Sequence, residues 1–368
     1  MKSPFYSLLI LLLLLFACNT DKNPHAPQSQ EAPRSALMTK QNDAVVERHQ
    51  LQVIQSRIEA MAPNLNPVKN RVTQAPQTII VPDPDNGIYT IQDGVNAASP
   101  QDTVLVLAGT YTEEIFINVP NICLFAEPGV LVKGGCYFLQ DNITMENFHV
   151  VVQRTGGSGI VVRDVSGSVV RKNTVEGGFF GIALNGSSFS LVEKNEVVNS
   201  EHDGLILHTA HNNTVTKNEC YGHRYDGLEV GESSTANEIS HNHCENNGSD
   251  GIRLHTSSTN HVLKNKCMNN GNGIGLLFSS EQNTIEKNKC NENELRGISL
   301  VENADNNLIG ANNIANKNGD CGILLDVNTS GNSVFKNIFL RNEHFDILNL
   351  GTNNEFSKNK AMVVEGTD

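Results

Sequence analysis

The 368-residue chain has no tryptophan, and aromatic residues make up only 5% of it. Few rings are therefore available as stacking platforms for nucleic-acid bases or for sugars. Cations are also scarce, because 27 Lys and Arg stand against 40 Asp and Glu, which gives a formal net charge of −13. The sequence shows no basic stripe with interleaved aromatics, which argues against nucleic acid as a partner. An acidic chain also repels a polyanionic glycan unless a cation or a local cationic cluster intervenes.

The sequence lacks an apolar run long enough to cross a bilayer, because the run at 8–16 is too short. This run follows Lys2 and ends in a lipobox-like LFAC, which predicts a secretory signal peptide over 1–18 with a lipid on Cys18. An ordinary cleaved signal with a free Cys18 is the alternative. The segment resembles bacterial lipoprotein signals, and Asn19 then implies sorting to the outer membrane, with the protein facing the periplasm or the cell surface.

The composition changes to Pro, Gln, Asn, Ser and charged residues over 19–77, which predicts a flexible tether. Within it, apolar residues recur at intervals of three and four and favour an amphipathic helix over 41–61. The polar side of that helix mixes Glu47 with Arg57, so we expect it to lie on the following domain or a neighbour rather than on a membrane. Membrane contact is expected through the N-terminal lipid only.

From residue 170 onward the sequence repeats with a period of 22 to 25 residues. Each unit has an apolar residue, an Asn three positions later, and a Gly that precedes an apolar-x-apolar triplet. The column of Asn residues reads Asn173, Asn195, Asn218, Asn242, Asn265, Asn288, Asn312, Asn337 and Asn359. Apolar pairs separated by one residue predict strands rather than helices, and repetition at this length predicts a solenoid.

Three short strands per coil predict an all-β, right-handed parallel β-helix of about ten or more coils over 78–364, which we expect to be monomeric. Successive coils would stack about 4.7–4.9 Å apart. Each Asn is predicted to bond the next Asn of its column at a bend that needs a left-handed backbone, and the Gly column to serve another bend in the same way.

The coils resemble those of the pectate-lyase-like superfamily, and residues 89–113, YTIQDGVNAASPQDTVLVLAGTYTE, resemble the opening coil of NosD-like and related carbohydrate-binding or sugar-hydrolysing repeat proteins. The resemblance implies a parallel β-helix whose open end is capped by an amphipathic helix at Ile91–Ala98. This fold hosts lyases, hydrolases, epimerases and plain binders, so it does not define an activity.

Four cysteines stand two residues after a column Asn, in a slot that other coils fill with Val, Ile or Phe: Cys220, Cys244, Cys267 and Cys290. We therefore predict that they are core residues. Stacking would also bring neighbouring Cα atoms within disulfide range. A soft-metal thiolate site is the remaining alternative, although its ligands would have to converge rather than form a column.

The outward strand positions mostly have apolar or small uncharged residues. In three successive coils, however, four side chains that can take part in acid–base or ionic chemistry share one face: His208, Glu229, Arg253 and His255. These are the candidate catalytic residues. Taken alone, Glu229 and Arg253 would form a cross-strand ion pair on an exposed strand, worth about 0.2–1 kcal/mol. Eight of the twelve histidines lie between residues 202 and 261, which concentrates titratable groups in this part of the chain.

Just before the same strands stand Asp203, Asp226 and Asp250, in register on neighbouring coils. Carboxylates about 5 Å apart repel each other by about 1 kcal/mol in water, so something should offset the repulsion. Either they bond the amides of the Gly turn that follows, or a cation such as Ca²⁺ lies between them.

Together these residues have the parts needed for abstraction of the C5 proton of a uronic acid. Arg253 or a cation would neutralise the sugar carboxylate, and His208 or His255 would take the proton. Another group must return a proton, as in a lyase or a C5-epimerase. The resemblance to polysaccharide lyases and alginate-epimerase-like β-helices implies the same class, although the sequence has no Asp-Pro-His run of the epimerase type and no Arg and Lys set of calcium-dependent pectate lyases.

Two other classes of function stay open. One is a non-catalytic glycan-binding or adhesion module, whose partner would be a uronate-containing polysaccharide. The other is a NosD-like periplasmic metal-handling protein that uses the histidines. For a glycoside hydrolase, Asp226 and Asp250 would be the acidic pair on neighbouring coils.

Overall fold

The computed structural model describes residues 50–52, 55–56 and 75–366. The predicted signal peptide over 1–18, its Cys18 and most of the predicted tether over 19–77 lie outside the described residues. Residues 50–52 and 55–56 are helical, and the rest of the helix predicted over 41–61 lies outside them. Within the described part, no helix is long and apolar enough to cross a membrane.

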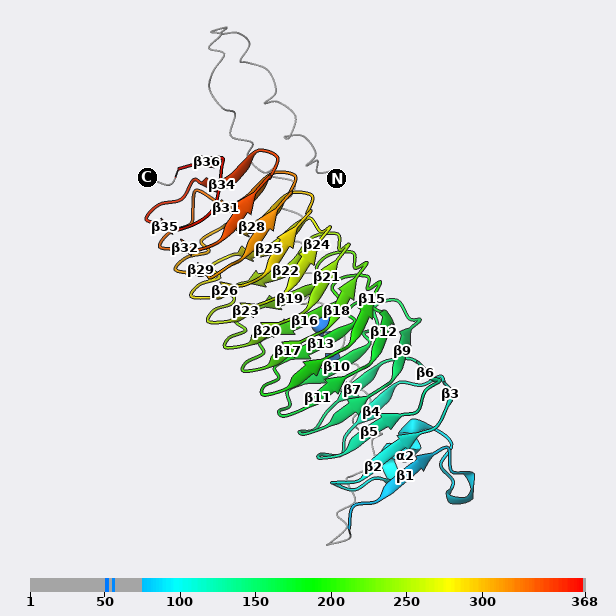
Figure 1. The fold of residues 1–368 in the computed structure, drawn as a ribbon. Coiled ribbons are helices and arrows are strands. Elements are labelled where there is room, and N and C mark those ends of the chain that lie inside the picture. Colours follow the sequence, from blue (N-terminus) through cyan, green and yellow to red (C-terminus); the bar gives the residue numbers. More distant parts are fainter. Residues whose placement is uncertain (1–49, 53–54, 57–74, 367–368) are drawn as a thin grey trace, which may run out of the picture. The chain divides into compact units, whose positions relative to one another are not determined.

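The structure is a solenoid of three parallel sheets (Figure 1). Along most of the solenoid, each strand pairs with the third strand after it in the chain, as β5 does with β8. The 13-stranded sheet contains β1 (Thr78–Val81), β2 (Thr103–Val106), β5 (Cys123–Ala126), β8 (Thr144–Glu146), β11 (Val169–Arg171), β14 (Leu191–Glu193), β17 (Thr214–Thr216), β20 (Glu238–Ser240), β23 (His261–Leu263), β26 (Thr284–Glu286), β29 (Leu308–Gly310), β32 (Ser333–Phe335) and β35 (Glu355–Ser357). The prediction of an all-β parallel β-helix is thus confirmed.

The other two sheets complete each coil. The 12-stranded sheet contains β4 (Ile115–Ile117), β7 (Cys136–Phe138), β10 (Ile160–Arg163), β13 (Ile182–Asn185), β16 (Leu205–His208), β19 (Leu228–Gly231), β22 (Asp250–His255), β25 (Asn272–Leu277), β28 (Arg296–Leu300), β31 (Cys321–Leu325), β34 (Phe345–Asn349) and β36 (Val364–Glu365). The 11-stranded sheet contains β3 (Gly109–Tyr111), β6 (Val130–Lys133), β9 (His149–Val152), β12 (Thr174–Gly177), β15 (Glu196–Val198), β18 (Glu219–Tyr221), β21 (His243–Glu245), β24 (Lys266–Met268), β27 (Lys289–Asn291), β30 (Ile314–Asn316) and β33 (Ile338–Leu340).

Helix α2 (Ile91–Ala97) lies at the N-terminal end of the stacked coils, after the short 3₁₀ helix η2 (Pro84–Asn86) (Figure 1). It contacts β1, β2 and β4 and buries Ile91 and Val95 in the core. A capping box fixes its start, because the Thr90 hydroxyl accepts from the Asp93 amide at 3.0 Å and the Asp93 carboxylate accepts from the Thr90 amide at 3.0 Å. The helix expected at Ile91–Ala98 is therefore present.

The core is one continuous column of apolar side chains that runs through all the coils. In most three-residue strands only the middle side chain points inward, as with Val170 and Val192. The four cysteines lie in this core, fully buried, and face one another between neighbouring strands of the 11-stranded sheet. Among the described cysteines none forms a disulfide, and the four are core residues, as predicted. Burial raises the pKa of the Cys267 thiol.

Asparagine ladders stabilise the bends between the sheets. At Asn242 the side-chain carbonyl accepts from the backbone and side-chain amides of Asn218 at 2.9 and 3.0 Å, and the side-chain amide donates to the Val215 carbonyl at 2.9 Å. The predicted ladder occupies the bend from the 13-stranded to the 11-stranded sheet. Two further ladders were not predicted, and they comprise Asn213, Asn237, Asn260, Asn283, Asn307, Asn332 and Asn354 at one bend, and His223, Asn247, Asn270, Asn293, Asn318 and Asn342 at the other.

One member of the predicted ladder was wrong. The Asn288 amide donates to Asn313 at 2.9 Å, whereas Asn312 is exposed outside the ladder. This coil has an extra turn residue, because Ala311 and Asn312 both have positive φ where other coils have a single such residue. The Asn residues that form this ladder do not themselves have a left-handed backbone. The positive φ falls on the residue just before each of them, as at Lys217 before Asn218.

The column of glycines is present, but the left-handed backbone predicted as its cause was wrong. Gly227 does not have a positive φ. A Cβ there would lie 2.7 Å from the Gly251 carbonyl oxygen and 2.9 Å from the Cys244 Cβ. The column is glycine because neighbouring coils and an inward side chain approach too closely for any other residue.

Candidate functional site

The predicted site residues lie together on the outer face of the 12-stranded sheet. Glu229 on β19 is directly opposite Arg253 on β22, and the other residues lie on or just before β16, β19 and β22. We call this group the outer-face cluster; it comprises Asp203, His208, Asp226, Glu229, Asp250, Arg253 and His255.

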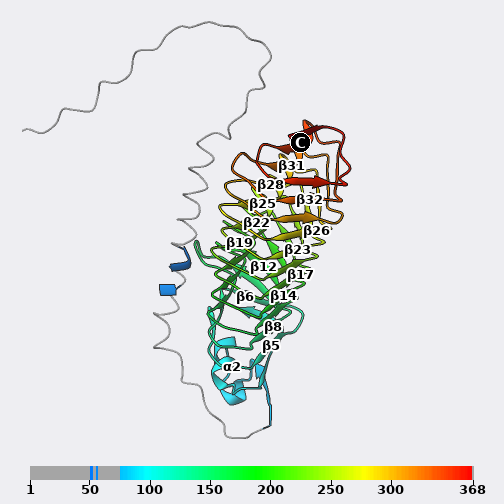
Figure 2. The ribbon, with the colours of Figure 1, turned by 90° about the vertical axis from the view of Figure 1, so that its left-hand side faces the viewer.

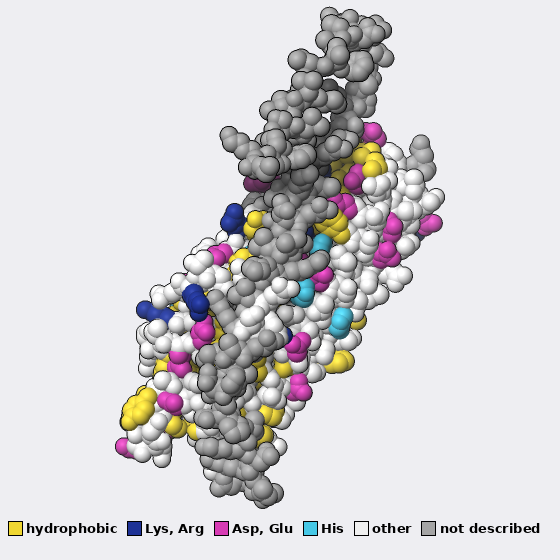
Figure 3. Space-filling model, turned by 180° about the vertical axis from the view of Figure 1, so that it is seen from behind, with side chains coloured by type: hydrophobic (Ala, Val, Ile, Leu, Met, Phe, Trp, Pro, Cys, Tyr) yellow, Lys and Arg dark blue, Asp and Glu magenta, His cyan; other side chains and the backbone are white. Residues whose placement is uncertain are grey.

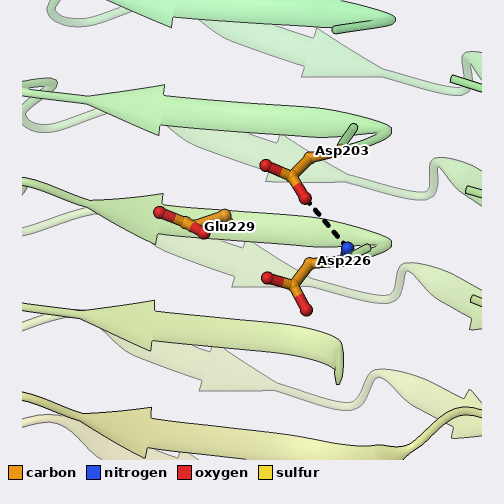
Figure 4. Close-up of side chains that lie close together, drawn as sticks. All are labelled: Asp203, Asp226 and Glu229. Carbon is orange, nitrogen blue, oxygen red and sulfur yellow. Dashed lines mark hydrogen bonds between the residues drawn. The ribbon is translucent and has the colours of Figure 1, made fainter. Parts of the chain in front are cut away.

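The three aspartates form a hydrogen-bonded column, and Figure 4 shows the bond between its first two members, Asp203 and Asp226. The Asp203 carboxylate accepts from the Asp226 backbone amide at 2.9 Å, and the Asp226 carboxylate accepts from the Asp250 amide at 2.7 Å. The Asp250 carboxylate accepts from the Asn272 side-chain amide at 2.8 Å. The expectation that each would bond the amide of its own Gly turn was therefore wrong, because the partner is one coil away. These bonds offset part of the repulsion between the stacked carboxylates.

Arg253 lies between two of the carboxylates. Its Nη1 is 3.1 Å from Asp226 Oδ2 and 3.5 Å from Glu229 Oε2, and only 3% of Arg253 and 1% of Glu229 are exposed. The sequence interpretation of an exposed cross-strand pair was wrong in this respect. A buried pair behaves differently from an exposed one, since removal of one partner leaves a charge in a medium that solvates it poorly.

The two candidate catalytic histidines flank the coil of Glu229. His208 is half-buried at the end of β16 opposite Gly231, and His255 is 6% exposed at the end of β22, with its ring edge-on to Phe278 at 5.0 Å. A Cβ on Gly231 would lie 2.6 Å from Glu229 Oε1. The glycine thus leaves room for the Glu229 carboxylate in the coil between the two imidazoles.

His202 also belongs to this region, although the sequence analysis counted it only among the clustered histidines and gave it no role. Its Nδ1 is 2.8 Å from Asp203 Oδ2, and its ring stacks on Phe179 at 4.9 Å and on Tyr225 at 4.3 Å. The three rings follow one another at a spacing of one coil, and that periodicity was the signal available in the sequence. Stacking fixes the imidazole orientation, so His202 orients Asp203.

The cluster extends one coil beyond the predicted residues, to Gly275 on β25. A Cβ there would lie 2.3 Å from Asp250 Oδ2, so this glycine accommodates the Asp250 carboxylate. Four carboxylates, those of the three aspartates and of Glu229, are therefore buried here; Arg253 pairs with Asp226 and Glu229, and the His202 imidazole faces Asp203. Such an excess of negative charge in a buried place favours an additional cation or bound protons.

Oxygen atoms of Asp203, Asp226 and Glu229 lie within 4.8 Å of one another, which is the arrangement that a single cation needs (Figure 4). Asp250, the third carboxylate predicted as a ligand, is not a member of this group. Carboxylate oxygens are the ligands that Ca²⁺ prefers, so the donor set fits the predicted cation. Within the described part of the chain this is the only such group found, and it contains neither a histidine nor a cysteine.

The outer face changes character along the solenoid. Its N-terminal half is apolar and includes Phe116, Tyr137 and Ile206, and the buried Leu51 packs against it. Figure 2 shows the ribbon of residues 50–52 alongside the stacked coils. The outer-face cluster follows in the next coils. Two surface hollows, of about 470 and 310 Å³, are lined by other residues, such as His149 and Glu113.

Comparison with known proteins places the chain in a fold family. The family model for a right-handed beta helix region matches residues 86–207, 128–284 and 180–339. The A-module of the Azotobacter vinelandii mannuronan C-5 epimerase AlgE6 is similar in structure, with a TM-score of 0.55 and 15% identity over 75% of this chain and 93% of that one. At this identity the likeness concerns the fold alone.

Two further solved structures are less similar. A mutant of the periplasmic alginate epimerase AlgG has a TM-score of 0.49 and 15% identity over 73% of this chain and 78% of that one. The Dettilon tailspike protein has a TM-score of 0.48 and 15% identity over 66% and 61%. No curated protein sequence matches the chain. The family match covers more than half of the chain and confirms the predicted handedness, so this protein belongs to the right-handed β-helix family.

Proposed function

We propose that the protein acts on a uronate-containing polysaccharide, and that the outer-face cluster abstracts the C5 proton of the sugar. The observation that carries the proposal is the convergence of carboxylates, a guanidinium and two imidazoles on three successive coils of an otherwise repetitive solenoid. The fold shared with a mannuronan C-5 epimerase A-module supports the same class of substrate.

Removal of a C5 proton requires that the negative charge of the sugar carboxylate be neutralised as the enolate-like intermediate forms. Arg253 is poorly placed for this role, because its Nη1 already contacts Asp226 and Glu229. A divalent cation held by Asp203, Asp226 and Glu229 would supply the neutralising charge. Arg253 then keeps two of these carboxylates in position.

The imidazoles of His208 and His255 are the acid–base groups of this proposal, since histidine titrates near neutral pH. One of them takes the C5 proton, and the other returns a proton, to the leaving oxygen in a lyase or to C5 in an epimerase. His208 is half-buried and the rest of the cluster is buried. Contact between a sugar and Glu229 or Arg253 therefore requires that these buried side chains become exposed.

Turnover of a panel of uronate polymers tests the proposal, with unsaturated products read by absorbance and C5 epimers by NMR. His208→Ala and His255→Ala should each lower turnover by a factor of roughly 10² to 10⁴. His261→Ala is the matched control, because His261 lies on β23 of the 13-stranded sheet, outside the cluster. Unchanged turnover in both cluster variants would contradict the proposed site.

A non-catalytic glycan-binding module is the second candidate, and the pairing of Arg253 with two carboxylates favours it. Such a module would bind uronate polymers in a way that depends on Glu229 and would never give product. The NosD-like metal-handling alternative draws no support from the described ligand group, which has no histidine. Transition-metal analysis of the purified protein separates it from the other two.

The proposed cation is Ca²⁺, and its test is independent of turnover. Added Ca²⁺ should raise the melting temperature of the parent protein, because a ligand that binds only the folded state stabilises it. Asp226→Asn should abolish this shift, whereas the exposed Asp164→Asn should retain it. An equal shift in all three proteins would contradict the proposed ligands.

We further propose that the protein is exported and anchored to the outer membrane through a lipid on Cys18. The support is the lipobox-like LFAC after a short apolar run. Cys18→Ser should move the protein from the membrane fraction to the soluble fraction and remove the mass of the lipid. Unchanged fractionation and mass would contradict the anchor.

A further inference from the structure

Lysine recurs at one bend of the solenoid, just before the Asn ladder that joins the 13-stranded to the 11-stranded sheet. The exposed residues at this position, coil by coil, are Lys172, Lys194, Lys217, His241, Lys264, Lys287, Asn312, Lys336 and Lys358. Seven of the nine are lysines. We call this column the lysine ridge. In the linear sequence these lysines lie more than twenty residues apart, so only the register of the coils brings them together.

The backbone at this bend does not favour lysine. Lys172, Lys264 and Lys336 all have a φ of 55°, in the left-handed region. Asn, Asp and Gly adopt that region most readily, and other residues do so at a cost of about 1 kcal/mol or more. Lysine at seven coils is therefore not explained by the conformation of the turn.

The other two bends provide an internal control, because they need the same conformation before their own ladders. One bend has Asn212, Ala236, Thr259, Gln282, Asn306, Gly331 and Asn353, and the other has Gly222, Asn246, Asn269, Glu292, Lys317 and Arg341. These sets mix small, neutral, acidic and basic residues. The fold thus tolerates many side chains at this position, and a positive charge is preferred only along the lysine ridge.

The charges of the lysine ridge are balanced at one end and not at the other. Lys172 pairs with Glu146 at 2.6 Å, and Lys217 pairs with Glu193 at 2.9 Å and lowers the pKa of that carboxyl. Over the described residues, Lys264, Lys287, Lys336 and Lys358 make no ion pair. Lys266 and Lys289 on β24 and β27 are also exposed and add two more cations beside this end. An acidic protein with a net charge of −13 therefore presents a row of unpaired cations on one edge.

The geometry of the row points to a linear polyanion. Coils stack about 4.7–4.9 Å apart, so the lysine ridge extends for about 38 Å with nearly one cation per coil. Polyuronates carry one carboxylate on each sugar, and the length of one sugar is close to the rise of one coil. DNA fits less well, because its phosphates follow one another at about 3.4 Å along a strand and wind around an axis.

We propose that the lysine ridge binds a polyuronate chain parallel to the solenoid axis, with one carboxylate to each coil. This site lies at the bend between the 13- and 11-stranded sheets, whereas the outer-face cluster lies on the 12-stranded sheet, so the two are separate. The choice of polymer rests on the proposed function. The lysine ridge holds the polymer near the enzyme and takes no part in the chemistry.

The test compares two variants of the full chain that remove the same number of charges. The first replaces Lys264, Lys287, Lys336 and Lys358 by Gln, and the control replaces Lys133, Arg154, Lys317 and Arg341 by Gln. The probe is a long polyuronate, with dextran and duplex DNA for comparison, and the dissociation constant is measured over a range of salt concentrations. All four ridge positions are exposed, as are three of the four control positions, and Lys133 is half-buried, so both variants should fold.

The lysine-ridge variant should bind polyuronate at least about tenfold more weakly than the control at low salt, and the salt dependence of its binding should fall by about one unit of slope for each lysine that contacts the polymer. Dextran should not bind. Equal affinities of the two variants, or tighter binding of duplex DNA than of polyuronate to the parent, would overturn the proposal.

The outcome is distinguishable from failure of the proposed function. Glu229→Gln should keep the affinity for long polyuronate, because the lysine ridge is intact, and lose turnover. If the parent binds polyuronate through the lysine ridge and gives no product, the lysine ridge stands and the proposed chemistry does not. If the lysine-ridge variant binds polyuronate as the parent does and the parent gives product, the proposed chemistry stands and the lysine ridge does not.

Discussion

The interior of the solenoid repeats from coil to coil, whereas the outer face of the 12-stranded sheet changes along its length. Inside, equivalent positions are filled by similar residues, such as Val192 and Val215. Outside, apolar residues up to Ile206 give way to Glu229 and Arg253. Repetition inside is what stacking requires, because each coil is covered only by its neighbours. The position where repetition stops on the outside is therefore where a role other than stacking is to be sought.

The largest effect on stability is expected for a substitution of Arg253, on the outer face. Arg253→Met should lower the free energy of unfolding by about 3–5 kcal/mol, because it leaves Asp226 and Glu229 buried without their counter-charge. Urea denaturation measures the change. From the sequence alone we would have expected a loss below 1 kcal/mol, since the pair was taken to be exposed.

The matched control is Arg296→Met. Arg296 lies further along the same sheet and pairs with Asp320 at 3.2 Å, but both side chains are about a quarter exposed. We expect a loss of about 1 kcal/mol or less there. Similar losses in the two variants would show that burial of the cluster does not govern its energetics.

The second prediction concerns the interior ladder. Asn242→Leu removes hydrogen bonds to Asn218, Asn265 and the Val215 carbonyl, and should cost about 3 kcal/mol through the polar groups left unsatisfied. Asn312→Gly should change the free energy of unfolding by less than about 0.5 kcal/mol, since Asn312 is exposed and left-handed. Thermal and urea unfolding of both variants measure these changes. A larger loss of stability in Asn312→Gly than in Asn242→Leu would contradict the assigned ladder.

A third prediction uses His223, which replaces Asn at the start of one ladder. Its Nδ1 accepts from the Ser200 amide at 3.0 Å, and burial depresses its pKa from 6.5 to about 4. The unfolded chain therefore binds more protons than the folded one between about pH 6.5 and pH 4. Stability is complete above pH 6.5 and falls as the pH is lowered toward 4, by at most ~3 kcal/mol.

His223→Asn restores the usual ladder residue and supplies the control. The variant should fold. Between pH 7 and pH 4 the parent should lose a few kcal/mol more of its free energy of unfolding than the variant does, because only the parent has His223. Parallel pH profiles of parent and variant would show that His223 does not titrate as its burial implies.

The smallest effect is expected in the thiol column. Cys244→Val should cost less than about 1.5 kcal/mol, because valine fills the same slot in other coils and the thiol is buried and neutral. Cys244→Ser should cost more, since it buries a hydroxyl among sulfur and carbon atoms. A severe loss in the valine variant, measured by thermal unfolding, would indicate that the thiols do more than fill the core.

Repetition explains which features were predictable. Asn242 and Cys244 were placed correctly because each is one member of a column that repeats through many coils. The extra residue at Ala311 broke that register by one position, and Asn313 was missed for that reason. A search for one Asn per coil also concealed the two other ladders.

The position of the candidate residues in the fold was predictable, but their environment was not. Periodicity placed Glu229 and Arg253 on the outer face, yet their burial depends on what lies over that face, and a strand pattern contains no such information. The pairing of His202 with Asp203 depends on the bend before β16. On the face shown in Figure 3, the visible acidic side chains are scattered rather than gathered in one patch.

Exchange of the C5 proton of a uronate polymer in D₂O tests the proposed chemistry most directly, because a lyase and an epimerase must both remove this proton. The parent protein with Ca²⁺ should diminish the C5 proton signal in the NMR spectrum, and the His208→Ala, His255→Ala double variant should leave it intact. A C5 signal that the parent never diminishes, on polymers that it demonstrably binds, would contradict proton abstraction and leave the protein a glycan-binding module.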